Sequence, residues 1–484
     1  MQHLSLALRG QPLQFVEFHI MTWLALDGPS NVDPSLIELF PNILHLLKSS
    51  VRYFNKQLCK QRYAWKAALW GLFSGRAPLM KEELIYKYIF LGALKTSSSY
   101  SLVRDLPRCG RGGKYQFEIQ RMHEKYGPIV RISPYELHIH DPDYYDTIYA
   151  GPVRVRDRYD WFVNVGAPES TLAAAHHDIH RRRRKTFSPY FSKQAVSGIG
   201  PLIQERVNRL CVHFSRARET GEALELHACF ASLASDIVSE YLFGKAHATR
   251  FLDQPTITDE WKRVITGMFE LLSTLRHFPW LATVGELFPF LVPYTLPPAV
   301  SLPPAKDAHL AVQRVLNADE QECDSTAVIP RILGSDKVPP EEKQLARLAD
   351  EVAFLQTAGT DAPSQALAIS MYHILNNPNV LARLKAELTT AFPTDRPDPT
   401  WSQLEKLPYF GAVIKECLRI SALVLVRLPR IAPYEILQYG EWQIPAGTPV
   451  GMSIHYILRD PTIFPEPLAF RPERWLQEGH TLDR

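Results

Sequence analysis

The sequence predicts a mainly α-helical protein with small β-sheets. Residues 341–376 form the longest helical pattern, because apolar side chains recur there at a spacing of three or four residues. Short apolar runs bounded by glycine and proline, such as Ile129 to Ile132, predict only brief strands. A chain of 484 residues, of which 46% are hydrophobic, can bury the large core that such a set of helices needs.

The chain changes character near residue 112. Residues 1–111 are heterogeneous and show only patchy helical periodicity, so we assign them to an atypical N-terminal region and residues 112–484 to the main domain. The apolar run from Leu13 to Leu26 carries charge and falls short of the roughly 18–20 residues that span a bilayer. We therefore expect no spanning helix, and a protein that is cytoplasmic or contacts a membrane only peripherally.

The main domain begins with short elements. Tyr115 to Tyr126 predicts an amphipathic helix, which Gly127-Pro128 stops. Ile129 to Ile132 and Leu137 to His140 predict two strands joined as a hairpin. Residues 196–245 are expected to be helical.

The later part of the domain alternates helices with proline-rich segments. Residues 278–304 hold many prolines and aromatic residues and are expected to form a loop beside a pocket or a membrane face. Three helices are expected after it, over residues 341–376, from Asn379, and from Tyr409 to Ser421. Short strands are expected around Gly440 and around residues 445–447, and the prolines from Pro461 to Pro472 predict an extended meander.

Composition argues against several classes of protein. The 54 Lys and Arg residues nearly balance the 51 Asp and Glu residues, whereas a nucleic-acid-binding protein usually has a clear basic excess. The six cysteines are scattered without a Cys-x-x-Cys pair, so neither a zinc site nor a dense disulfide framework is expected. We therefore expect no nucleic-acid partner and a reducing compartment.

One helix and the meander carry the most informative spacing. Glu416 and Arg419 lie three residues apart on the helix predicted from Tyr409, so both side chains leave the same face. Alone, such a pair is most often an exposed ion pair. The meander that follows ends in Phe-Arg-Pro-Glu-Arg-Trp, from Phe470 to Trp475.

These motifs, in this order and after a long helix that holds Ala358 to Asp361, resemble the cytochrome P-450 family of haem-thiolate monooxygenases. Leu407 to Tyr409, Arg427 to Arg430 and Ile444 to Pro449 look like its fungal branch, the trichodiene-oxygenase-like enzymes of secondary metabolism. The resemblance implies a haem (heme) cofactor, electrons from an NADPH-dependent flavin reductase, and hydroxylation or epoxidation of a lipophilic natural product. It also implies that the protein is located at the endoplasmic reticulum membrane.

The resemblance assigns Glu416, Arg419 and Arg474 to a buried ion-pair triad that locks the meander against the helix. A buried carboxylate between guanidinium groups is tolerated only while each charge keeps its partner, and removing one costs about 3–5 kcal/mol. We expect these three residues to be structural and not catalytic.

The strongest charge run is His-Arg-Arg-Arg-Arg-Lys, from His180 to Lys185. A nucleic-acid or nuclear-localisation patch and a solvated helix face are the alternatives. The resemblance implies that His180 and Arg184, which share a helix face, bind the haem propionates, since a guanidinium can bind a carboxylate through two hydrogen bonds. Arg430 resembles the third propionate contact, and Arg427 is its local competitor.

The long helix matches the family's oxygen-activating motif with one departure. The resemblance implies that Gly359 leaves room for dioxygen and that Asp361 is the general acid that supplies protons. A partner for a nearby cation is the alternative for Asp361. The usual threonine is Ala362 here, and the hydroxyl of Ser364 lies about 200° further round the helix, where it cannot replace the threonine.

The family's iron ligand is a cysteine in a Phe-x-x-Gly-x-Arg-x-Cys-x-Gly loop after the meander. This sequence has no such loop, and its last cysteine, Cys417, lies on the apolar side of a predicted helix. We therefore predict no metal ligand in this chain, a domain truncated before the cysteine loop and the last long helix, and a protein that is inactive as written. The alternative is a non-catalytic relic or truncated gene product that acts, if at all, through protein contacts.

Overall fold

The computed structural model describes residues 115–259, 303–318, 324–393 and 399–476, apart from 152 and 164–166, and also residues 262 and 265. The chain divides into two units, Met1–Leu106 and Pro107–Arg484, and all described residues belong to the second. The N-terminal region and most of the loop predicted over 278–304 lie outside the described residues. The domain boundary at residue 112 stays a prediction.

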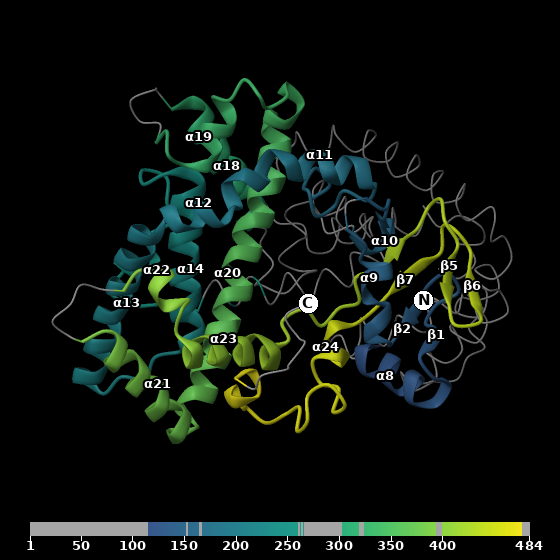
Figure 1. Cartoon of the computed structure of the whole chain (residues 1–484). Coiled ribbons are helices and arrows are strands. Elements are labelled where there is room, and N and C mark those ends of the chain that lie inside the picture. Colours follow the sequence, from purple (N-terminus) through teal and green to yellow (C-terminus); the bar gives the residue numbers. More distant parts are fainter. Residues whose placement is uncertain are drawn as a thin grey trace, which may run out of the picture. The chain divides into compact units, whose positions relative to one another are not determined.

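Within these ranges the protein is mainly helical with small sheets, which confirms the predicted fold class (Figure 1). The α-helices are α8 (Tyr115–Tyr126), α9 (Tyr145–Ile148), α10 (Asp160–Val163), α11 (His177–Phe187), α12 (Lys193–Gly198), α13 (Gly200–Thr220), α14 (Leu226–Phe243), α18 (Pro303–Asn317), α19 (Val328–Leu333), α20 (Leu345–Leu375), α21 (Pro378–Ala391), α22 (Trp401–Leu404), α23 (Pro408–Ser421) and α24 (Ile454–Ile457). Short 3-10 turns are η1 (Pro142–Tyr144), η2 (Ser188–Phe191), η3 (Phe251–Asp253), η6 (Pro340–Lys343) and η7 (Pro472–Trp475). Among the described helices, none combines the length and the apolar character needed to cross a bilayer.

Two small sheets connect distant parts of the domain. The strands are β1 (Ile129–Arg131), β2 (Leu137–Ile139), β3 (Asp157–Arg158), β4 (Arg430–Ile431), β5 (Leu437–Tyr439), β6 (Trp442–Ile444) and β7 (Pro449–Gly451). The larger sheet has the order β1-β2-β7-β4-β3, in which β7 runs parallel to β2 and antiparallel to β4. Strands β5 and β6 form a separate hairpin. Strand β7 therefore joins the early hairpin to the strands that follow α23.

Helix α20 is the centre of the helical part, and α14 and α18 pack along it (Figure 1). Their buried apolar side chains form one core, which includes Leu242, Phe243, Val312, Leu348 and Val352. Two of these, Leu348 and Val352, belong to the apolar stripe that predicted this helix. The stripe therefore marks the buried face of α20.

The structure differs from the predicted elements at several breaks. The helical region predicted over 196–245 is divided among α12, α13 and α14, and α13 ends at Gly221, whose φ of 71° favours glycine. The long helix begins at Leu345 because the turn η6 occupies the residues before it. Helices α18 and α19 were not predicted. The prolines at the start of α18 indicated a loop, but the first turn of a helix accepts proline, since its N–H needs no partner there.

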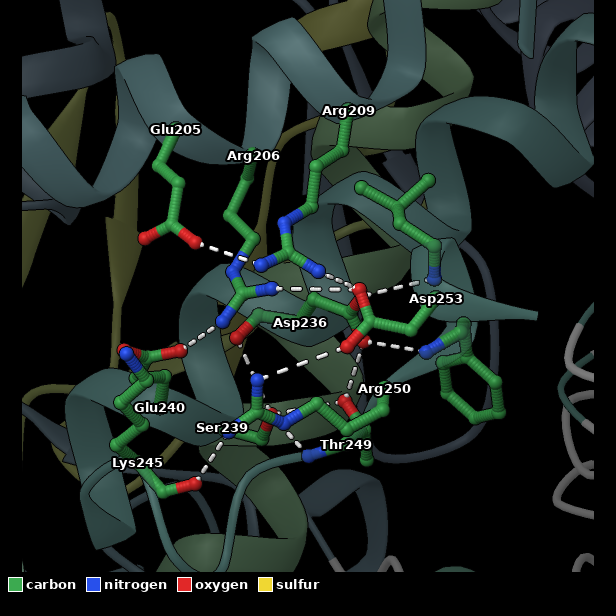
Figure 2. A network of polar contacts seen from close by, with 12 residues as sticks. Glu205, Arg206, Arg209, Asp236, Ser239, Glu240, Lys245, Thr249, Arg250 and Asp253 are labelled. Carbon is green, nitrogen blue, oxygen red and sulfur yellow. Dashed lines mark hydrogen bonds and ion pairs between the residues drawn. The ribbon is translucent and has the colours of Figure 1, made fainter. Parts of the chain in front are cut away.

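A buried polar network holds the segment after α14, as Figure 2 shows. The carboxylate of Asp236 is fully buried and accepts hydrogen bonds from Thr249 Oγ1 at 2.9 Å, from the Phe251 N–H at 2.9 Å and from the Leu252 N–H at 3.0 Å. Burial raises the pKa of Asp236, although these three donors and the Arg206 charge oppose the rise. The network fixes the turn η3 against α13 and α14.

Candidate functional site

Glu416 on α23 is the acceptor at the centre of a buried charge cluster. Arg419 donates to its carboxylate through Nε and Nη2, both at 2.8 Å, and Arg474 on η7 donates through Nε at 3.2 Å. The Trp475 ring N–H and the Arg471 backbone N–H add bonds of 2.9 Å each. Burial alone would raise the pKa of Glu416, but the Arg419 side chain and the other donors hold it below its ordinary value.

The two guanidinium groups of this cluster also bind the meander. Arg419 Nη1 donates to the backbone oxygens of Leu458 at 2.9 Å and Pro467 at 2.7 Å. Arg474 Nη1 donates to the Pro465 oxygen at 2.9 Å. These carbonyls lie in an irregular, proline-rich segment, where regular secondary structure cannot satisfy them. The three residues that sequence reasoning grouped as a triad thus meet and attach the meander to α23.

A second cluster of basic side chains gathers where α11 meets the strand pair β3 and β4. His180 and Arg184 lie on α11, and Arg158 on β3 is the direct antiparallel partner of Arg430 on β4. Arg158 Nη2 donates to His180 Nε2 at 2.9 Å. We call Arg158, His180, Arg184 and Arg430 the basic cluster. Sequence reasoning named three of its members and missed Arg158, because only the pairing of β3 with β4 brings it there.

The charges of the basic cluster repel one another. Burial, and then the charges of Arg158, Arg184 and Arg430, lower the pKa of His180 to about 4. Burial, and then Arg430 and Arg184, lower the pKa of Arg158 to about 10. Among the described residues, no carboxylate lies within the 4.0 Å ion-pair distance of the three arginines. Within the described part of the chain the cluster therefore has no carboxylate in ion-pair contact, and Glu351 offsets the repulsion at Arg158 only in part, from a longer distance.

Arg427, the predicted competitor of Arg430, is engaged elsewhere. Its Nη2 donates to Glu136 Oε2 at 2.8 Å and its Nε donates to Glu136 Oε1, and both side chains are buried. Arg430 instead donates to the backbone oxygens of Leu428 and Pro429, at 3.3 and 3.2 Å, and burial lowers its pKa. Of the two candidates, only Arg430 belongs to the basic cluster.

Gly359 lies on the side of α20 that faces α14. A Cβ at this position would be 2.9 Å from Val238 Cγ2, so the absence of a side chain allows the two helices to approach closely. This packing explains a glycine here without reference to a ligand. The predicted contribution of Gly359 to a dioxygen site stays a prediction.

Asp361 contacts a neutral partner on its own helix. Gln365 Nε2 lies 2.9 Å from each of its carboxylate oxygens. No cation among the described residues forms an ion pair with Asp361, so the alternative of a cation partner is not seen there. Ser364, two residues after Ala362, donates to the Asp361 backbone oxygen at 2.9 Å. Its hydroxyl is therefore occupied by the helix, in agreement with the expectation that it does not replace the missing threonine.

The described cysteines do not form a metal site with other residues. Within the described ranges, no group of three or more His, Cys, Asp or Glu side chains could hold a metal ion. Cys417 is buried among Val413, Tyr409 and other apolar side chains, and burial raises the pKa of its thiol. This placement agrees with the prediction that Cys417 is a core residue.

The basic cluster fits an anionic group with two carboxylates. Three guanidinium groups and an imidazole converge without a carboxylate partner in the described residues, and guanidinium is the side chain best suited to bind carboxylates. Haem carries two propionates. The residues present therefore fit the propionate end of a haem.

Comparison with known proteins identifies the family. The cytochrome P-450 family model matches residues 96–483, and the chain belongs to this family. It is 35% identical over 400 residues to cytochrome P-450 monooxygenase pbrB of Penicillium brasilianum, covering 80% of this chain and 75% of that protein. It is 36% identical over 377 residues to cytochrome P-450 monooxygenase TRI4 of Trichoderma arundinaceum, covering 76% and 71%. It is 36% identical over 368 residues to a conidiogenone synthase of Penicillium rubens, covering 76% and 73%.

Proposed function

We propose that this protein is a haem-dependent monooxygenase of the type found in fungal secondary metabolism, which hydroxylates or epoxidises a lipophilic natural product, and that its activity requires the iron ligand of the family's cysteine loop, which these 484 residues do not contain. Family membership and relatives whose names describe monooxygenases support this function. The basic cluster is the observation that carries it, since four basic groups converge without a carboxylate partner in the described residues. Electrons would come from an NADPH-dependent flavin reductase.

The basic cluster would hold the propionates of the haem. When bound, haem supplies one-electron and oxygen chemistry. Arg158, Arg184 and Arg430 would donate to the propionate oxygens through guanidinium N–H groups. His180 Nε2 already accepts a hydrogen bond from Arg158, so this ring is neutral and carries its proton on Nδ1. The negative charge of a propionate would offset the repulsion within the cluster and raise the pKa of His180.

Asp361 would act as the general acid, the role that the sequence predicted for it, and would supply protons to the reaction. Its Gln365 contact holds the carboxylate in place without neutralising it. Because Ala362 has no hydroxyl, water or a substrate hydroxyl would complete the proton path. In a form of the protein that has the iron ligand, Asp361→Asn should slow substrate oxidation about 10²- to 10⁴-fold, the range typical of a lost general acid.

An apolar surface supports a lipophilic substrate. Val424, Leu425 and Val426 are 45%, 50% and 48% exposed, although they follow one another in the chain. Consecutive exposed apolar residues are unusual on a protein surface without a ligand or partner. This segment lies in the chain between α23 and the strand that carries Arg430, and we expect it to line the substrate pocket.

A hemin titration of the full chain tests the proposed propionate site. We expect Arg184→Ala and Arg430→Ala each to weaken hemin binding about 10- to 100-fold, because each removes a charge-assisted hydrogen bond of about 1.5–3 kcal/mol. Arg181→Ala is the matched control, since Arg181 lies on the same helix, is exposed and is outside the cluster. Equal effects from Arg181→Ala and Arg184→Ala would contradict the site.

Product formation separates the enzyme from the non-catalytic alternative. The protein is incubated with hemin, a flavin reductase, NADPH and a panel of terpenes, and oxygenated products are measured by mass spectrometry. Products that depend on NADPH support the monooxygenase. Hemin binding without any product would contradict an active monooxygenase and would agree with the prediction that a chain without the cysteine ligand is inactive.

A further inference from the structure

Three buried charges, one on η6 and two on the first turns of α20, have no part in the function proposed above. Arg347 donates through Nε to Glu342 Oε2 at 2.9 Å and through Nη1 to Glu351 Oε2 at 2.6 Å. All three side chains are buried. Burying three charges is costly, and structural gain alone is a weak explanation, because apolar residues of similar size are often as stable.

Thr171 connects these charges to the loop before α11. Its backbone N–H and its hydroxyl both donate to Glu351 Oε2, at 2.7 and 2.8 Å. Arg347 Nη2 adds a bond of 3.3 Å to the same hydroxyl oxygen. Thr171 is therefore fixed on one side by the start of α20.

On its other side Thr171 holds the basic cluster. Its backbone oxygen accepts from Arg158 Nη1 at 3.2 Å, and the oxygen of the next residue, Leu172, accepts from the same nitrogen. Arg158 Nη2 then donates to His180. A continuous path of hydrogen bonds thus runs from Glu342 through Arg347, Glu351, Thr171 and Arg158 to His180.

The path of hydrogen bonds holds Arg158 in place against the repulsion within the basic cluster. Arg184 and Arg430 repel the Arg158 guanidinium, so a side chain without restraint would turn away from them. The carbonyls of Thr171 and Leu172 restrain it, and the charge of Glu351 is the attraction that partly offsets the repulsion. An arginine held in place before binding loses less conformational entropy when an anion arrives.

We propose that Glu351, through Thr171, is a positioning residue that holds Arg158 in the basic cluster and so prepares the cluster to bind a dianionic ligand. This inference rests on the proposed function, because the ligand there is the propionate pair of haem. It adds one thing to that function, which is that the buried charges of η6 and α20 support Arg158.

The first test is a double-mutant cycle on hemin affinity, measured with the full chain. We expect Arg158→Ala to weaken hemin binding about tenfold and Glu351→Gln to weaken it about three- to tenfold. In the Arg158→Ala background, Glu351→Gln should have no further effect, because its action passes through Arg158. Asp350→Asn is the matched control, since Asp350 neighbours Glu351 and binds the same loop at the Glu169 N–H, at 2.8 Å, but has no bond to Thr171.

The second test uses the free protein and needs no haem. His180 is titrated by NMR of ¹³C-labelled histidine, with His180→Asn to assign its signal. Burial, and then the charges of Arg158, Arg184, Arg430 and His177, lower the pKa of this ring to about 4. If Glu351→Gln releases Arg158, the pKa of His180 rises toward its ordinary value of about 6.5. Asp350→Asn should leave the titration unchanged.

The outcomes separate the two proposals. If neither Arg158→Ala nor Arg184→Ala weakens hemin binding, the proposed function fails. If both weaken it while Glu351→Gln changes neither affinity nor the His180 titration, only the positioning inference fails. Should Glu351→Gln fail to fold, Thr171→Val removes the two hydrogen bonds of the hydroxyl, to Glu351 and from Arg347, and keeps the bond from the backbone N–H. It should move both readouts in the same direction by a smaller amount.

Discussion

Replacing Glu416 by glutamine removes a buried negative charge while almost preserving the shape of the side chain. Five hydrogen bonds converge on this carboxylate, and two of the donors are the guanidinium groups of Arg419 and Arg474. The substitution leaves both cations buried without a negative partner. The free energy of unfolding should fall by about 3–5 kcal/mol, the usual cost of breaking a buried ion pair from one side.

The expected shift in melting temperature follows from the size of the unit Pro107–Arg484. An unfolding entropy of about 2.1 cal/mol/K per residue gives about 0.8 kcal/mol/K for this unit, so the midpoint should fall by about 4–6 °C. Differential scanning calorimetry measures it. Urea unfolding followed by circular dichroism gives the free energy directly.

A matched control exists on α8. Glu118 and Arg121 have the same spacing of three residues and the same N–O distance of 2.8 Å, but their side chains are 49% and 70% exposed. Glu118→Gln should cost less than about 0.5 kcal/mol, because water screens an exposed pair. If Glu416→Gln costs no more than Glu118→Gln, the buried triad does not secure the meander and the reasoning from burial is refuted.

Three further substitutions test other parts of the structure. Gly359→Ala places a Cβ 2.9 Å from Val238 Cγ2 and should lower the free energy of unfolding by about 1–3 kcal/mol, and Val238→Ala in the same chain should restore it. Burial lowers the pKa of His138 well below its ordinary value, so the free energy of unfolding falls as the pH falls below about 6.5. His138→Gln should make this fall in the free energy of unfolding shallower by up to about 1.4 kcal/mol per pH unit, measured by urea titrations. Asp236→Ala removes three hydrogen bonds and should cost about 2–3 kcal/mol by the same titration, whereas a change under about 0.5 kcal/mol would contradict the network of Figure 2.

The parts of the fold that sequence predicted are those with local patterns. The helix predicted from Tyr115 to Tyr126 has these ends in the structure, because Gly127, with a φ of 94°, stops it. Helix α18 was missed because its prolines resemble a loop signal and its apolar residues face α20. Proline has opposite meanings in a loop and in the first turn of a helix, and only the packing distinguishes them.

The same limit applies to the candidate site. His180 with Arg184 and Glu416 with Arg419 could be paired from sequence, since spacings of three and four residues fix one helix face. Arg158 could not be found this way, because its place beside Arg430 depends on the pairing of strands far apart in the chain. Glu351 is further removed still, because it acts on Arg158 through the backbone of Thr171. Residue spacing therefore predicts which side chains are neighbours within one helix, whereas contacts between elements depend on the topology of the fold.

The two charge clusters differ in how they are compensated, and this difference separates structure from binding. Glu416 meets its cations within the described residues, and its pKa lies below the ordinary value, as expected of a carboxylate that its partners stabilise. The basic cluster shows the reverse, since the pKa of Arg158 falls to about 10 and that of His180 to about 4. A compensated cluster loses stability when any member is removed. In an uncompensated cluster the like charges repel one another until an anion binds. Removing Arg184 or Arg430 should therefore relieve this repulsion in the free protein and weaken ligand binding. Removing Glu416 should therefore lower stability, whereas removing Arg184 or Arg430 should raise stability and lower affinity for the ligand.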